Sequence, residues 1–287
     1  RTYYYAYLFF CGVVFFFLIA PLIAIIPISF SVSPFMVFTD EMLTWPPDPD
    51  AWSLRWYKNM IGNCSADVVS STVPCSNKWM IGTVNSFFIG FVATFIATTL
   101  GTLAALGLSR PHMPYKGLIM AILISPMIVP LIITAAGMFF FYARINLVYS
   151  FTGIILAHVA LATPFVVITV TATLVGFDMN MVKASQSLGA RPVRTFFKVI
   201  MPLILPGVIS GALFAFITSF DEVVVVMFMA SLDQLTIPKQ MWAGIRQEIS
   251  PVILCMATCL VILSILLLTT VELLRRRSEK LRGIKSR

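Results

Sequence analysis

Six long apolar runs constrain the fold of this sequence more than any other feature. Hydrophobic residues make up 59% of the 287 residues and charged residues only 11%. A soluble domain carries roughly 25% charged residues, and a helix needs about 20 mostly apolar residues to cross a bilayer. We therefore predict an all-α membrane protein with six transmembrane helices. They are expected at about Tyr5–Phe30, Met80–Leu108, Gly117–Phe141, Phe151–Val175, Leu203–Ala230 and Pro251–Leu274.

The Lys and Arg residues set the orientation of these spans, because cytoplasmic loops carry an excess of them. With six spans both termini share a side, and fourteen of the twenty Lys and Arg residues fall on that side. They are Arg1, Arg110, Lys116, Lys183, Arg191, Arg194, Lys198, Arg275, Arg276, Arg277, Lys280, Arg282, Lys285 and Arg287. We predict that both termini are cytoplasmic. This placement of the +8 net charge suits anionic headgroups and membrane orientation better than nucleic acid.

The predicted segments follow from these spans. A first transmembrane helix at 1–30 is retained, because it is too long and too aromatic for a signal peptide. A periplasmic loop at 31–79, a transmembrane core at 80–274 and a basic cytoplasmic tail at 275–287 follow it. Residue 1 is Arg rather than Met, so we expect further residues before it.

The five cysteines fall into two groups. Cys11, Cys255 and Cys259 lie in apolar runs, where a free thiol behaves as a small hydrophobe. Cys64 and Cys75 lie in the polar outer loop, where the sequence allows either a disulfide between them or two free thiols. Cys255 and Cys259 share a helix face, but no His or further Cys is nearby. No metal site is therefore predicted.

Aromatic residues gather in the same outer loop. Trp45, Trp52, Trp56 and Tyr57 indicate one of two arrangements. They anchor a short helix at the membrane interface, or they form a docking surface for an external partner.

The stretch between the fourth and fifth spans, residues 176–203, predicts a helix, a sharp turn and a second helix. Asp178 can cap the start of the first helix. Gly189 is well placed to end it, and Pro192 suits the first position of the next helix. Periodicity alone does not separate this arrangement from an ordinary amphipathic surface helix.

The same stretch carries a family resemblance. The pattern Lys183-Ala184-Ser185, then Gly189, then Ile200-Met201-Pro202 resembles the EAA loop of binding-protein-dependent ABC importer permeases. Three further stretches, at 164–170, 174–178 and 219–225, resemble the spermidine/putrescine (polyamine) permease subfamily. The likeness covers the second to sixth spans. Lys183 departs from the motif, which has Glu there, and Ser185 replaces its second Ala.

The resemblance implies a type I ABC importer permease fold, with a five-helix core and a cytoplasmic coupling helix between helices 4 and 5. The loop would fit a groove on an ATP-binding subunit. The residues implied in that contact are Lys183, Ala184, Ser185, Gln186, Leu188, Gly189, Ala190 and Arg191. Implied partners are a second related permease, two ATP-binding subunits, a periplasmic substrate-binding protein and membrane lipid.

The sequence predicts a transport subunit rather than an enzyme. It has no Gly-x-x-x-x-Gly-Lys-Ser/Thr loop to hold nucleotide phosphates. We therefore expect no cofactor in this chain, with ATP and Mg bound by the partner ATPase. His112 lies in a turn and is expected to be solvated. For His158, inside the fourth span, a hydrogen bond between helices is favoured over a role in a transport pathway.

Two adjacent acids, Asp221 and Glu222, lie inside the fifth apolar run. At 1.5 Å per residue the pair is roughly 23 Å from the cytoplasmic end of that run. A charge there is costly, so the pair is expected to face a pathway for a cationic substrate. The alternative is that the acids are protonated, or bond to neighbouring helices, and stabilise the bundle.

The predicted function is a permease subunit that imports a small, cationic solute such as spermidine or putrescine. Within the class, the alternative substrates are an amino-acid derivative, an opine or a phosphonate. An ion-coupled secondary transporter is the alternative from another class, and it would show inverted repeats and broken helices. A membrane-embedded enzyme would need a polar catalytic constellation that this sequence lacks.

Overall fold

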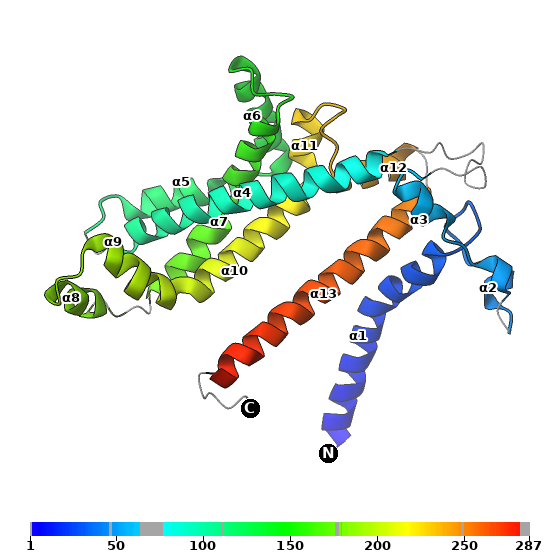
Figure 1. The fold of residues 1–287 in the computed structure, drawn as a ribbon, viewed down its shortest axis with the longest axis horizontal. Coiled ribbons are helices and arrows are strands. Elements are labelled where there is room, and N and C mark those ends of the chain that lie inside the picture. Colours follow the sequence, from blue (N-terminus) through cyan, green and yellow to red (C-terminus); the bar gives the residue numbers. More distant parts are fainter. Residues whose placement is uncertain are drawn as a thin grey trace. The chain divides into compact units, whose positions relative to one another are not determined.

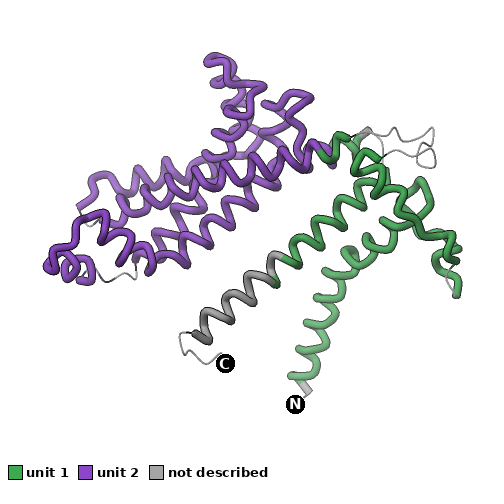
Figure 2. The backbone as a smooth tube through the Cα atoms, in the orientation of Figure 1, with its two compact units in different colours: residues 1–80, 243–287 green, residues 81–242 purple. Residues whose placement is uncertain are grey.

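The computed structural model describes residues 2–45, 48–63, 77–110, 112–175, 178, 180–247 and 250–281, and these are helical apart from loops and one isolated bridge. Within these ranges, four helices are long and apolar enough to cross a membrane. They are Tyr3–Ser29, Lys78–Leu108, Phe151–Val175 and Pro192–Phe220. The chain forms two compact units, residues 1–80 with 243–287, and residues 81–242 (Figure 2).

Unit 1 is built on two long helices that pack against each other, α1 and α13. Its elements are α1 (Thr2–Ser29), α2 (Asp40–Leu43), the 3₁₀ turn η1 (Pro49–Ala51), α3 (Arg55–Met60) and α13 (Val252–Leu281). The pair is joined where α1 ends. There the carbonyl of Ser29 accepts a hydrogen bond from the Cys255 Sγ at 3.4 Å, and the Ser29 hydroxyl lies 2.7 Å from the Tyr57 hydroxyl. Cys11, Cys255 and Cys259 are free thiols, as predicted.

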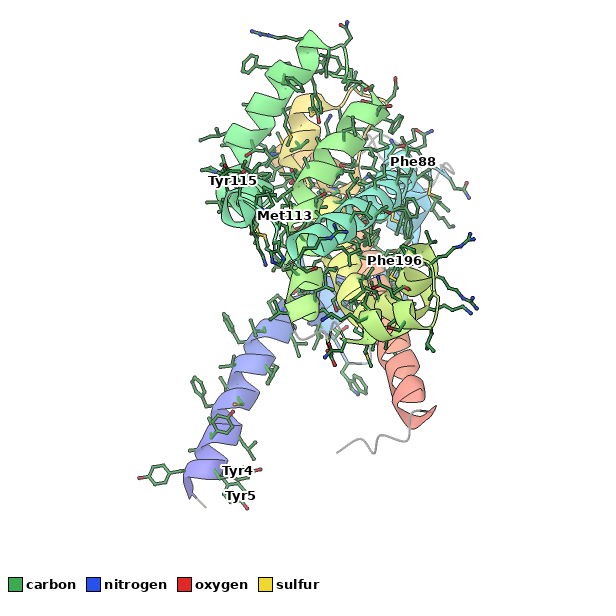
Figure 3. The ribbon with its side chains drawn as sticks, turned by 90° about the vertical axis from the view of Figure 1, so that its left-hand side faces the viewer. Tyr4, Tyr5, Phe88, Met113, Tyr115 and Phe196 are labelled. Atoms are coloured by element: carbon green, nitrogen blue, oxygen red, sulfur yellow. The ribbon has the colours of Figure 1, made fainter. Side chains whose placement is uncertain are left out.

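The first helix presents apolar side chains on almost every side. Figure 3 shows Tyr4 and Tyr5 projecting from its first turns, and both are well exposed. A helix that is hydrophobic all round is stable only within an apolar environment. The exposed surface of α1 therefore suits lipid or another membrane helix.

The aromatic residues between α1 and the end of α3, which the sequence analysis grouped together, lie in different environments. Trp56 is fully buried, and its Nε1–H donates to the carbonyl of Ser31 at 2.9 Å. Ser31 also pairs with Trp52 in the isolated bridge, whereas Trp45 is 92% exposed. Trp56 is thus part of the local core rather than a surface anchor. Cys64 and Cys75 lie outside the described residues.

Unit 2 contains most of the predicted core, and α7 and α10 are its most closely packed pair (Figure 1). Its elements are α4 (Lys78–Leu108) and α12 (Ile237–Gln247), which both continue into unit 1, with α5 (Lys116–Ile128), α6 (Leu131–Arg144), α7 (Phe151–Val175), α8 (Asn180–Ser187), α9 (Pro192–Thr195), the π-turn η2 (Phe196–Ile200), α10 (Met201–Phe220) and α11 (Val224–Met229).

Glycine allows the close approach of α10 to α7. A Cβ placed on Gly211 would lie 2.5 Å from the Thr169 Oγ1 and 3.0 Å from the Cα of Val166. A Cβ on Gly207 would collide with Thr173. Small residues at helix interfaces let backbones approach in this way in membrane proteins.

The third predicted span is not one straight helix. Helices α5 and α6 meet at an angle of 103° around Val129 and Pro130. Pro130 has no backbone N–H to donate, and the residue before a proline avoids the helical region, as the extended Val129 shows at ψ 137°. The apolar run 117–141 is therefore a bent pair rather than a continuous helix.

The fifth predicted span also ends early. Helix α10 stops at Phe220, and α11 begins at Val224, so the run 203–230 is interrupted at residues 221–223. In the sixth, α13 begins at Val252 and remains helical to Leu281. The first part of the predicted basic tail is therefore helical.

Candidate functional site

The stretch between α7 and α10 folds as the helix, turn and helix that the sequence predicted. The side chain of Asp178 accepts a hydrogen bond from the backbone N–H of Asn180 at 2.9 Å, at the start of α8. Such a bond satisfies one of the free N–H groups at a helix start. The capping role predicted for Asp178 is confirmed.

Gly189 ends α8. Its φ of +78° lies in the left-handed region that other residues rarely adopt. The N–H of Gly189 donates to the Gln186 carbonyl at 2.9 Å, and the N–H of Ala190 donates to the Ser185 carbonyl at 3.1 Å. These two bonds form a Schellman motif, which satisfies the last carbonyls of the helix. The prediction that Gly189 stops the first helix is confirmed.

The second helix returns the chain to the membrane. It begins at Pro192, as predicted, after an extended Arg191 at ψ 153°. It runs through the π-turn Phe196–Ile200 directly into α10. Thr195 is buried, and its hydroxyl lies 3.0 Å from that of Ser185. This contact ties α9 to α8 across the turn, and no pattern in the sequence indicated it.

The outward side of α8 is exposed. Val182 and Ser185, which are half-buried, mark its inner side. At 100° per residue the opposite side carries Lys183, Ala184 and Ser187, and all three are exposed. We call these three residues with Leu188 the α8 crest; Leu188 follows them at the turn and is 88% exposed.

Further cations lie in the second half of this loop, in and next to α9 and η2. Arg191, Arg194 and Lys198 are exposed, and Phe196 is half-buried within the same loop (Figure 3). Residues 176–203 contain one acid, Asp178, against four cations. The loop therefore presents a basic surface around the exposed apolar side chain of Leu188.

The two predicted acids occupy different environments at the other end of α10. Asp221 is exposed, whereas Glu222 is buried. The Glu222 Oε1 accepts a hydrogen bond from the backbone N–H of Val225 at 2.8 Å, in the first turn of α11. Glu222 therefore stabilises the start of α11. Asp221 alone presents its carboxylate to the surroundings, so the two acids are not an equivalent pair.

The basic loop and the acids lie at opposite ends of α10, as Figure 1 shows for α8, α9 and α11. Helix α10 has 20 residues, which at 1.5 Å per residue is about 30 Å, the thickness of a hydrocarbon core. One continuous helix therefore connects the basic loop to Asp221.

A buried polar contact joins α7 to α10 close to the acids. The His158 Nδ1 lies 2.8 Å from the Ser219 Oγ, and both residues are buried. This is the bond between helices that the sequence favoured for His158. His112, by contrast, is exposed in its turn.

The segment after α11 is held by side-chain amides that the sequence did not single out. The Gln234 Nε2 donates to the Tyr149 carbonyl at 3.0 Å. The Asn85 Nδ2 donates to the carbonyls of Asp233 and Leu235 at 3.1 and 2.9 Å. These bonds fix the chain leaving α11 against α4 and the turn before α7. Only a three-dimensional arrangement reveals them, because Asn85 and Gln234 are far apart in sequence.

Comparison with known proteins now assigns the chain. Residues 97–280, more than half of the sequence, match the family described as binding-protein-dependent transport system inner membrane component. The chain belongs to this family. It is a multi-pass inner-membrane transport subunit and not an enzyme, and ATP hydrolysis belongs to a separate subunit. Membership also decides against the ion-coupled secondary transporter.

Relatives with named transport functions align with most of the chain. It is 28% identical over 270 residues to the spermidine/putrescine transport system permease protein PotC of Haemophilus influenzae, covering 94% of this chain and 96% of that protein. It is 31% identical over 190 residues to PotC of Escherichia coli K12, covering 66% and 72%. It is 27% identical over 250 residues to the E. coli K12 putrescine transport system permease protein PotI, covering 84% and 80%.

Two solved structures share the fold. A bacterial ABC transporter involved in the import of the acidic polysaccharide alginate matches with a TM-score of 0.68 and 14% identity, covering 96% of both chains. The MetNI methionine ABC transporter matches with a TM-score of 0.50 and 21% identity, covering 74% of this chain and 100% of that one. The predicted importer-permease fold is confirmed. Family members act within a transporter complex that includes an ATPase and a binding protein.

Proposed function

We propose that this chain forms half of the translocation pathway for a small cationic solute, spermidine or putrescine, in an ATP-driven importer. The observation that carries this proposal is the likeness to the PotC protein of H. influenzae, which extends over 94% of the chain. The fold does not specify the substrate, because the structural neighbours are named for an acidic polysaccharide and for methionine. An amino-acid derivative, an opine or a phosphonate stays the alternative substrate.

The proposed coupling site is the loop 176–203 with residues Lys183 to Arg191 at its centre. Its support is the exposed α8 crest, which the Gly189 turn connects to α9, and the uninterrupted run of α9 through η2 into α10. An ATP-binding subunit that grips this loop would move α10 when it closes. ATP and Mg belong to that subunit.

The proposed substrate contact is Asp221, with Glu222 as the residue that shapes the break beside it. An exposed carboxylate in a break between apolar helices suits a cationic amine. The outer position of the break follows from the charge distribution, which puts residues 176–203, the N-terminus and the tail 275–287 in the cytoplasm. The loop 31–79 is then periplasmic, and the core spans 80–274.

The proposed assembly contains this chain, a second related permease, two ATP-binding subunits and a periplasmic substrate-binding protein. Support for the second permease comes from the apolar surface of α1, which unit 1 itself leaves exposed. We propose that Cys64 and Cys75 lie on the periplasmic side, where a disulfide between them can form.

The test is reconstitution of the complete complex in liposomes with the binding protein outside and ATP inside. We expect ATP-dependent accumulation of radiolabelled spermidine or putrescine. Uptake of a neutral or anionic metabolite instead would overturn the substrate assignment. Uptake driven by an ion gradient without ATP would contradict the proposed function as a whole. A preceding measurement of amine binding by the binding protein identifies the ligand to use.

A further inference from the structure

The cation at the centre of the α8 crest has a consequence for the partner. Lys183 is exposed and lies on the side of α8 opposite Val182 and Ser185. Its neighbours on the crest are the small residues Ala184 and Ser187, which leave the ammonium group at the outermost surface of the helix. Any protein that covers the crest must therefore cover Lys183.

Covering that ammonium group is unfavourable unless an opposite charge meets it. A buried, unpaired ammonium loses its hydration and either loses its proton or requires a paired acid. The loop itself offers no acid for this purpose, because Asp178 is its single acid and already caps α8 through Asn180. The compensating carboxylate must come from the partner.

We infer that the groove which receives α8 on the ATP-binding subunit carries an Asp or Glu opposite Lys183, beside an apolar pocket for Leu188. This inference rests on the proposed function, because it takes the loop as the docking site. The four cations of residues 176–203 extend the complementarity, so the rim of the groove is acidic as well. The apolar pocket follows from Leu188, which stands almost completely exposed at the turn.

The test measures binding of the purified ATP-binding subunit to the full-length permease pair, this chain with its partner permease, in nanodiscs. Lys183→Glu is expected to weaken association with that subunit by roughly 30-fold or more, since it places two acids against each other. Lys183→Arg keeps the charge and is expected to retain binding. Lys116→Glu is the matched control, because it makes the same change of charge at an exposed site in the first turn of α5, and binding should be unchanged.

Zero-length crosslinking identifies the facing residue. A carbodiimide joins a lysine amine to a contacting carboxylate as an amide, with the loss of water. Mass spectrometry should find Lys183 joined to an Asp or Glu of the ATP-binding subunit. The product should vanish in Lys183→Arg, because a guanidinium does not couple. Reversing the identified acid to Lys should restore binding to the Lys183→Glu complex.

The outcomes separate the two proposals. The first outcome is that the unmodified permease pair binds the ATP-binding subunit, that Lys183→Glu binds it equally well, and that Lys183 forms no crosslink. The inference of an acidic groove is then wrong, while the proposed coupling site is not contradicted. If the unmodified complex does not bind the subunit at all, both are wrong. If Lys183→Glu changes only the association with anionic lipid vesicles, the crest contacts the membrane and the inference is also overturned.

Discussion

The hydroxyl of Ser185 lies 3.0 Å from the hydroxyl of Thr195, across the turn that Gly189 makes. Ser185 also donates to the Val182 carbonyl at 2.8 Å. Thr195 is buried, so this hydroxyl pair is enclosed between the two short helices of the loop. It holds α8 and α9 together as one unit across the turn.

Ser185→Ala is expected to loosen that unit. A hydrogen bond of this kind contributes about 1 kcal/mol, so uptake per ATP hydrolysed should fall several-fold while the complex still assembles. Ser125→Ala is the control, because it lies outside the loop and its hydroxyl donates to the Ile122 carbonyl of its own helix at 2.8 Å. Equal coupling ratios in the two variants would contradict a tie between α8 and α9.

Gly189→Asp is expected to uncouple transport from ATP hydrolysis without stopping membrane insertion. The left-handed backbone costs a residue with a Cβ about 1–2 kcal/mol, so the turn should open. Space is not the cause, since a Cβ there meets no atom within 4 Å.

Gly189→Asn separates the effect of charge from that of the backbone, because Asn and Asp both tolerate the left-handed region better than most residues and differ in charge. It should retain more uptake than Gly189→Asp. Both ATPase activity and solute uptake are measured on the same liposomes. Normal uptake by Gly189→Asp would refute the coupling role of the turn.

Replacing Asp221 by Asn and Glu222 by Gln together should abolish uptake of a cationic solute and leave assembly intact. The structure leads to a different expectation for a substitution at each of the two acids. Asp221→Asn should reduce uptake alone, because the carboxylate is exposed. Glu222→Ala should also reduce stability by about 1–3 kcal/mol, since it leaves the Val225 N–H unpaired.

Uptake of labelled amine and the thermal unfolding of the purified complex distinguish these contributions. Unchanged uptake in the double variant would exclude the acids from the pathway. Unchanged thermal stability in Glu222→Ala would contradict its role at the start of α11.

Gly211→Val is expected to separate α7 from α10. Its side chain would meet the Thr169 Oγ1 and the Cα of Val166, and the backbone cannot move aside as a side chain can. Overpacking of this kind costs about 1–3 kcal/mol, which should lower the midpoint of thermal unfolding. Gly137→Ala provides the comparison, because a Cβ on Gly137 meets no atom within 4 Å and stability should hold.

Local chemistry decided which parts of the fold could be predicted. Gly189 and Pro192 each have a backbone preference that fixes a boundary by itself, and both boundaries are where the sequence placed them. The bend at Pro130 and the end of α10 at Phe220 were missed, because apolarity reports the surroundings of a run and not its continuity. The start of α11 depends on the hydrogen bond that the Glu222 carboxylate accepts from the Val225 N–H.

The site divides in the same way. The exposure of Lys183 follows from the helical period of α8, which can be read from the residues, whereas Leu188 lies beyond the last residue of α8 at the turn. The pairing of Ser185 with Thr195 depends on how the following helix is wound, and nothing in the nine residues between them reports that winding.

The π-helical turn at Phe196–Ile200 lies between α10 and Thr195, the residue that meets Ser185. Counting two α-helical turns, about seven residues, back from the buried Ile204 reaches Phe197. Phe197 is nevertheless 61% exposed, and the buried residue is Thr195, at 2%. The wider turn shifts the register of the residues before it relative to α10, so regular helical counting does not identify the buried residue of α9. A residue-for-residue exchange of this loop with a relative that lacks the shift would therefore put the wrong side chain against α8.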